Sequence, residues 1–93
     1  MSRIDDLAAA LASGRFGHAS LEDDSGVLLD THGRDVMALN PSGNLVVECL
    51  LAGAGSMDDL VAAMVDEFNV APETACTDLE PFLEGLAEVL LEP

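Results

Sequence analysis

Lysine is absent from this sequence, and only three arginines stand against eighteen aspartates and glutamates. The formal net charge is therefore −15 over 93 residues. Affinity for a nucleic acid comes from Lys and Arg side chains that release counterions from the phosphates, so DNA binding is the least favoured role. The same shortage of cations argues against attachment to an anionic membrane surface, and no apolar run approaches the roughly 20 residues that span a bilayer.

Cysteine and histidine are also scarce. Cys49 and Cys76 lie far apart inside apolar helical patterns, where cysteine behaves as a small hydrophobic residue. With no secretory signal at the N-terminus, they do not form a disulfide framework, so we expect a reducing cytoplasm. Neither cysteine stands at a metal-ligand spacing from His18 or His32, and the sequence predicts no metal site and no cofactor.

The sequence contains no arrangement of residues that is typical of catalysis. An enzyme needs a nucleophile beside a base, a metal cage or tuned carboxylates in a pocket. Acidic pairs such as Asp5-Asp6 and Asp58-Asp59 are expected by chance among eighteen acids. No glycine-rich motif joins a strand to a helix, as a nucleotide-phosphate site requires. We therefore predict a protein that is not an enzyme.

The length and a hydrophobic content of 49% are typical of one small globular unit with a single core. Apolar residues at helical spacing over residues 3–13, with aspartates near the start and Gly14 after the end, predict a short helix. We expect residues 1–14 to form an N-terminal helical extension and residues 15–93 to form the main domain.

Three short strands are expected next, because turn residues separate runs around residues 16–21, 27–30 and 34–39. Tight turns would join these runs into an antiparallel meander. The last run mixes charged and apolar positions, which is typical of an edge strand.

Three helices are expected after the strands. Asn40-Pro41 predicts the start of a helix that ends near residue 51, since Asn caps a helix and Pro fits its first position. Ser56, with Asp59 three residues later, predicts the start of a second helix. An apolar stripe predicts a third helix over residues 72–91.

Proline interrupts the third of these helices. Pro81 lacks the backbone N–H that would pair with the carbonyl of Thr77, so a kink or a break is expected between these two residues. The whole pattern predicts an α+β fold that is winged helix-turn-helix-like, with a three-stranded antiparallel sheet followed by three helices and an extra short N-terminal helix.

Short motifs over residues 26–91 resemble those of the PqqD family of peptide-recognition domains. In the first half they are Gly26-Val27-Leu28-Leu29-Asp30, Leu39-Asn40-Pro41 and Glu48-Cys49-Leu50-Leu51, closing at Gly53. In the second half they are Asp59-Leu60-Val61, Glu67-Phe68-Asn69-Val70, Pro72-Glu73-Thr74-Ala75, Asp78-Leu79, Phe82-Leu83 and Leu86. The resemblance is carried by spacing and not by any reactive residue.

This resemblance implies a noncatalytic module that captures the leader segment of a ribosomally synthesised precursor peptide. The module would present the leader to a modifying enzyme, such as a radical or cyclising enzyme, in natural-product biosynthesis. The leader would add as a strand to the edge of the third strand and pack beside the third helix. By the same resemblance, the receiving edge is Asp35, Val36, Met37 and Ala38, with Arg34 next to it as a further peptide-binding residue, and the groove wall is Leu79, Phe82, Leu83 and Leu86.

Elementary physics supports the same mechanism, since an added strand satisfies backbone groups that an open sheet edge leaves unpaired. A net charge of −15 favours encounters with basic segments. Arg34, beside the expected edge, is the local exception and could meet a carboxylate. A second interpretation of the groove wall also stays open: its four residues are simply part of the hydrophobic core, because an amphipathic stripe is usually core.

Three other functions stay open. A homodimerising structural protein would use the same edge strand to pair with itself. An acidic carrier protein would bear a prosthetic arm on Ser25, although Asp24-Ser25 precedes a strand-like run and not a helix. A DNA-binding winged helix would need a basic third helix, and this one carries Asp78, Glu80, Glu84 and Glu88.

Overall fold

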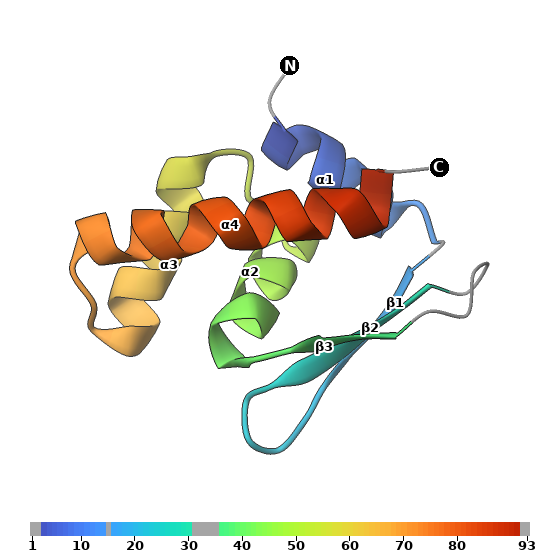
Figure 1. Ribbon diagram of the computed structural model, residues 1–93, viewed down its shortest axis with the longest axis horizontal. Helices are drawn as coiled ribbons and strands as arrows, with labels where there is room; N and C mark the ends of the chain where they lie inside the picture. Colours follow the sequence, from blue (N-terminus) through green and yellow to red (C-terminus); the bar gives the residue numbers. More distant parts are fainter. Residues whose placement is uncertain (1–2, 15, 31–35, 92–93) are drawn as a thin grey trace.

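The structure, a computed structural model, describes residues 3–14, 16–30 and 36–91 (Figure 1). In chain order its elements are α1 (Arg3–Ala12), β1 (Phe16–Ser20), β2 (Gly26–Asp30), β3 (Val36–Leu39), α2 (Pro41–Leu51), α3 (Met57–Phe68) and α4 (Pro72–Leu91). The α+β class is confirmed, with a three-stranded antiparallel sheet followed by three helices and preceded by a short one.

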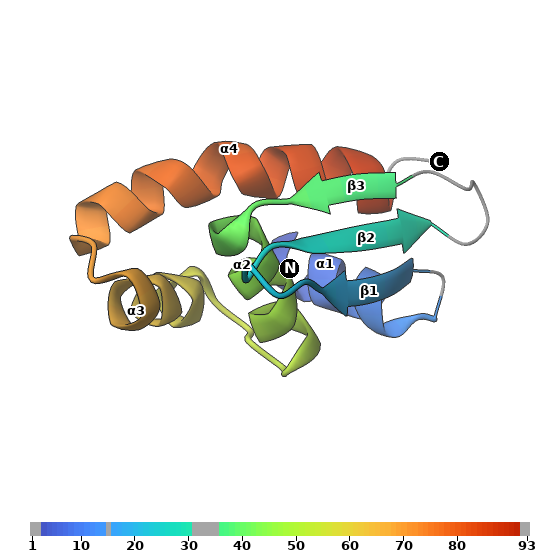
Figure 2. The same cartoon turned by 90° about the horizontal axis from the view of Figure 1, so that it is seen from below.

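The sheet has the order β1-β2-β3, and both strand pairs are antiparallel. Its side chains alternate between the two faces: Leu28 and Leu39 are buried, whereas Leu29 and Val36 are exposed. Figure 2 shows the strands in front of the helices, so the described helices all lie on one side of the sheet. The core therefore lies between that face and the helices.

Hydrophobic residues from every helix meet the buried side of the sheet in one core. α2 packs against β2 and β3, and α4 packs against α3 and α1. α1 contributes Ile4, Leu7 and Leu11 to the same core as Leu86 and Leu90 of α4. The boundary that we expected at residue 14 thus stays a prediction, but α1 shares the core of the elements that follow it.

Capping side chains begin α2 and α3 where the sequence predicts. Asn40 Oδ1 accepts a hydrogen bond from the backbone N–H of Gly43 at 2.8 Å, and Ser56 Oγ accepts one from Asp59 at 3.2 Å. These bonds satisfy N–H groups that have no partner inside the helix. Asn69 ends α3 in a left-handed conformation with φ of 54°.

The sequence predicts a kink or a break near Pro81; α4 continues as one helix through Pro81, so the break does not occur. Pro81 and Thr77 are both exposed, and the missing hydrogen bond therefore lies on the solvent side of the helix. The hydroxyl of Thr77 also donates to the carbonyl of Glu73 at 2.9 Å. Burial of Leu79 and Leu83 on the opposite side keeps both halves of the helix on the core.

A buried asparagine joins α2 to the β1–β2 hairpin. His18 Nε2 donates to Asn44 Oδ1 at 2.5 Å, and Asn44 Nδ2 lies within hydrogen-bonding distance of Ser20 Oγ, the Asp24 carbonyl and Glu48 Oε1. These contacts satisfy the amide of Asn44, which would otherwise be costly to bury. They fix the hairpin relative to the helix.

Gly26 leaves the space that Asn44 fills. A Cβ atom at Gly26 would lie 2.1 Å from Asn44 Oδ1 and 2.8 Å from the backbone carbonyl of Ala19. The backbone carbonyl cannot move without breaking the hairpin. Glycine is thus required here by close approach and not by an unusual backbone angle.

We expect Gly26→Ala to lower the free energy of unfolding by about 1–3 kcal/mol, because the added methyl overpacks the hairpin against α2. Gly17→Ala is the matched control in the same sheet, since a Cβ there meets no atom within 4 Å. It should change stability by less than about 0.5 kcal/mol. Urea unfolding of both variants measures the difference, and equal stabilities would contradict the packing of Asn44 on Gly26.

A chain with a net charge of −15 repels itself, and salt screens that repulsion. We expect the thermal midpoint to rise by about 4–8 °C, equivalent to roughly 1 kcal/mol, between low salt and about 1 M NaCl. KCl should have the same effect as NaCl if screening is the cause. A midpoint that stays flat across this range would rule the effect out.

Candidate functional site

The outer edge of β3 has no strand partner within the described residues. β3 pairs with β2 alone, through Val27↔Ala38 and Leu28↔Met37 among others. Val36, at the start of the strand, is 65% exposed. Since the second edge of a strand offers backbone donors and acceptors, this edge is able to receive a further strand.

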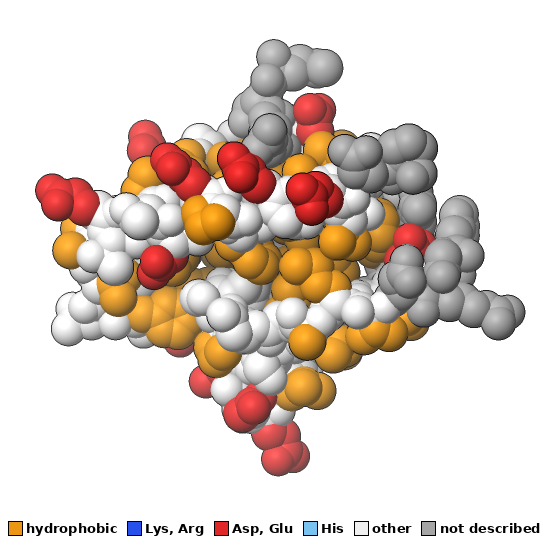
Figure 3. All heavy atoms as spheres, in the orientation of Figure 1, with side chains coloured by type: hydrophobic (Ala, Val, Ile, Leu, Met, Phe, Trp, Pro, Cys, Tyr) orange, Lys and Arg blue, Asp and Glu red, His pale blue; other side chains and the backbone are white. Residues whose placement is uncertain are grey.

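α4 runs along the β3 side of the sheet and beyond its edge, not along the β1 side (Figure 2). Its packing partners α1 and α3 hold it in that position. Figure 3 shows hydrophobic side chains in the hollow between α4 and the sheet, with acidic side chains on the outer side of α4. The open edge of β3 thus lies next to an apolar hollow.

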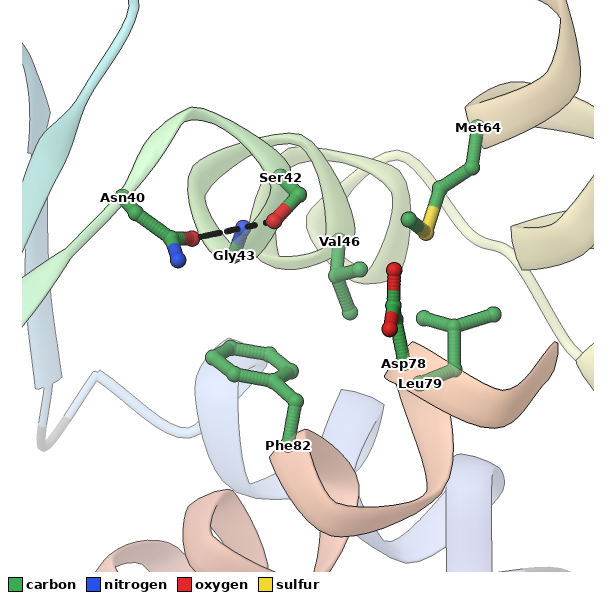
Figure 4. A pocket seen from close by; sticks show the side chains of 8 residues that line it. All are labelled: Asn40, Ser42, Gly43, Val46, Met64, Asp78, Leu79 and Phe82. Carbon is green, nitrogen blue, oxygen red and sulfur yellow. Dashed lines mark hydrogen bonds between the residues drawn. The ribbon is translucent and has the colours of Figure 1, made fainter. Parts of the chain in front are cut away.

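A pocket of about 350 Å³ opens where β3 passes into α2, opposite α4 (Figure 4). Its lining comes from the β3–α2 junction, α2, α3 and α4: Asn40, Ser42, Gly43, Val46, Met64, Asp78, Leu79 and Phe82. The pocket therefore continues the hollow at the end of the open strand.

Phe82 is the predicted groove residue that the structure leaves partly exposed. Leu79, Leu83 and Leu86 are buried in the core, and of these three Leu79 also lines the pocket. In Figure 4 the ring of Phe82 faces the first turn of α2. The amphipathic stripe of α4 thus supplies mostly core, with one aromatic ring at its border with solvent.

Gly43 permits the position of this ring. A Cβ atom at Gly43 would lie 2.8 Å from Cε1 and 3.1 Å from Cζ of Phe82. Any larger residue at position 43 therefore displaces the ring, although a side chain gives way more easily than a backbone. The Asn40 cap starts α2 at the place that sets Gly43 against α4.

The predicted edge residues are described only in part. Val36, Met37 and Ala38 lie on β3, with Val36 and Ala38 exposed and Met37 half-buried. Arg34 and Asp35 lie outside the described residues.

Sequence reasoning missed the α2 side of the pocket, which comprises Asn40, Ser42, Gly43 and Val46, together with Met64 and Asp78. The only local signal is glycine in the first turn of a helix, which leaves room for a neighbour. The contact of Gly43 with Phe82 joins residues far apart in the chain.

A second pocket, of about 230 Å³, lies on the other side of α2. It is lined by Asp24, Pro41, Leu45, Glu48, Glu67 and Phe68. None of these residues belongs to β3 or α4, so this pocket is separate from the open edge.

The described residues contain no group of three or more His, Cys, Asp or Glu side chains that could hold a metal ion. Burial raises the pKa of the Cys49 thiol, and the charges of Glu48 and Asp59 raise it further. A raised pKa makes a thiol less reactive at neutral pH, which is the opposite of what a nucleophile needs.

Ser25, the residue that a carrier protein would modify, lies before β2 in the β1–β2 turn. Its N–H donates to Asp23 Oδ1 at 3.1 Å, and its hydroxyl donates to the same oxygen. These hydrogen bonds lower the pKa of Asp23. Ser25 therefore helps to form a tight turn.

The family model described as coenzyme PQQ synthesis protein D (PqqD) matches residues 25–91. The chain belongs to the PqqD family. The match includes β2, β3 and the helices α2 to α4, and thus all the residues that line the pocket beside β3. Comparison with curated proteins and with solved structures found no match.

PqqD proteins form a noncatalytic accessory family in PQQ synthesis. Membership indicates a partner protein in the biosynthesis of PQQ or of other ribosomally made, modified peptides. Within the described residues, no helix is long and apolar enough to cross a membrane.

Gly43→Ala should move the Phe82 ring while the fold remains intact. The clash is with a side chain, and Ala is favoured over Gly inside a helix by up to about 1 kcal/mol, so stability should change by less than about 1 kcal/mol. Nuclear Overhauser effects between the Phe82 ring and Val46 would report the ring position. Gly85→Ala is the control on α4, because a Cβ there meets no atom within 4 Å. An unmoved ring in Gly43→Ala would contradict the contact.

Proposed function

We propose that this chain captures the leader segment of a ribosomally synthesised precursor peptide and presents it to a modifying enzyme. The leader adds as a strand to the outer edge of β3, and one of its side chains enters the pocket beside Phe82. The enzyme, of radical or cyclising type, acts in trans in the cytoplasm. The chain itself takes no part in the chemistry.

The observation that supports this proposal is an open β3 edge beside a partly exposed aromatic pocket, in a member of the PqqD family. Strand addition gives affinity through backbone hydrogen bonds, and pockets for alternate side chains give specificity. The β1 edge of the same sheet also lacks a second strand partner within the described residues, but the lining of this pocket begins at Asn40, directly after β3, and includes no residue of β1 or of the β1–β2 turn. The pocket therefore lies at the end of β3, which favours the β3 edge as the receiving edge.

The proposed roles divide the predicted site residues into three sets. Val36, Met37 and Ala38 supply the edge, and the proposal extends it to Arg34 and Asp35. Phe82 and Leu79 contact the guest side chain. Leu83 and Leu86, which are buried and do not line the pocket, hold α4 in place and support the wall without touching the peptide.

Self-association through the same edge is the competing function. Two copies of a chain with a net charge of −15 repel one another, which disfavours the homodimer relative to a basic guest. Sedimentation at several concentrations distinguishes the two. A tight dimer whose dissociation is required for peptide binding would favour self-pairing.

Phe82→Ala should weaken binding of leader peptides by about 1–3 kcal/mol, equivalent to roughly 5–150-fold in Kd, because it removes an aromatic contact from the pocket. Fluorescence anisotropy with a panel of labelled candidate leaders measures the change. Phe68→Ala is a matched control, since Phe68 is also half-buried but lines the separate pocket on the other side of α2. Its affinity for the leader should stay within about twofold of the parent chain.

An unchanged Kd in a folded Phe82→Ala chain would remove Phe82 from the site. Circular dichroism establishes whether the variant folds. If it does not fold, Phe82→Leu keeps the apolar volume and tests the loss of the aromatic ring alone.

A further inference from the structure

One acidic side chain lines the pocket proposed to hold the leader. Asp78 is placed on α4 four residues before Phe82, so both lie on the same side of the helix. In Figure 4 its carboxylate lies beside Val46 and Met64, at the end of the pocket away from Asn40. The pocket therefore has polar side chains, Asn40 and Ser42, at one end, apolar side chains along its walls and a negative charge at the other end.

The other acidic residues in this part of α4 do not line the pocket. Glu80, Glu84 and Glu88 are exposed, as Asp78 is, but unlike Asp78 they do not line the pocket. None of the eight residues that line the pocket is basic, so no cation among them neutralises Asp78. The charge of Asp78 is thus available to a bound peptide.

We propose that Asp78 selects leaders that carry Lys or Arg next to the apolar side chain that enters the pocket. This inference rests on the proposed function, because it assigns the charge preference of the same site to one residue. A cationic side chain can lay its aliphatic stem along Val46 and Met64 and place its charge at the carboxylate. An acidic residue at the same position of the leader is repelled.

The positive end of the α2 dipole is the competing influence on the pocket. It amounts to about half a charge and falls off within the first turn, where Asn40 already accepts a hydrogen bond from Gly43. Asp78 carries a full charge and lies at the other end of the pocket. The carboxylate of Asp78 therefore decides whether that end of the pocket prefers a basic or an acidic side chain.

The test uses peptides selected against the full chain from a random library displayed on phage. Selected peptides that Phe82→Ala weakens are resynthesised with their basic residue beside the apolar anchor changed to Gln or Glu. Each peptide is titrated against the parent chain, Asp78→Asn and Glu84→Gln. The last variant removes the same charge from the same helix but away from the pocket.

The parent chain and Glu84→Gln should bind the basic peptide about fivefold more tightly than its Glu counterpart in low salt. Asp78→Asn should bind the two peptides within about twofold of each other. This loss of preference, with Gln peptides in between, identifies Asp78 as the residue that reads the charge.

Two results would overturn the inference while leaving the proposed function intact. One is a set of selected peptides that need Phe82 but carry no basic residue beside the anchor. The other is a charge preference of equal size in Asp78→Asn and in the parent chain. If Phe82→Ala weakens none of the selected peptides, the proposed function itself fails at this pocket.

Discussion

The candidate site depends on how α4 is held. Four buried leucines, Leu79, Leu83, Leu86 and Leu90, fix one side of this helix to the core. At about 1.5–3 kcal/mol for each fully buried leucine, this packing outweighs the hydrogen bond that Pro81 removes. The helix is thereby kept on α1 and α3, and the edge of β3 stays uncovered. A helix that packed on β3 itself would leave no site.

Local chemistry made the elements predictable. Asn40 before Pro41, and Ser56 before Asp59, fix helix starts through bonds that span only three residues. Of the kink or break predicted at Pro81, the break was wrong, because packing on the core holds both halves of the helix together. That packing comes from α1 and α3, which the sequence of α4 does not reveal.

The pocket was less predictable than the fold. An amphipathic stripe identifies Leu79, Phe82, Leu83 and Leu86 as one face, but it does not show which member lies at the border with solvent. That depends on Gly43, which is distant in sequence and leaves room for the ring. The family resemblance predicted the open edge and the groove helix. The structure added the α2 side of the pocket and Asp78. The first helix lies outside the family match, yet its leucines fill the same core.

The short open strand has a consequence for the chain in isolation. An edge that can receive a guest backbone can also receive the edge of another copy, and natural proteins guard such strands with charge. β3 itself, Val36–Leu39, carries none. The acidity of the molecule as a whole supplies protection, because it keeps copies apart over a distance set by the ionic strength. Salt that screens the charge repulsion within one copy therefore also weakens the charge repulsion that keeps two copies apart.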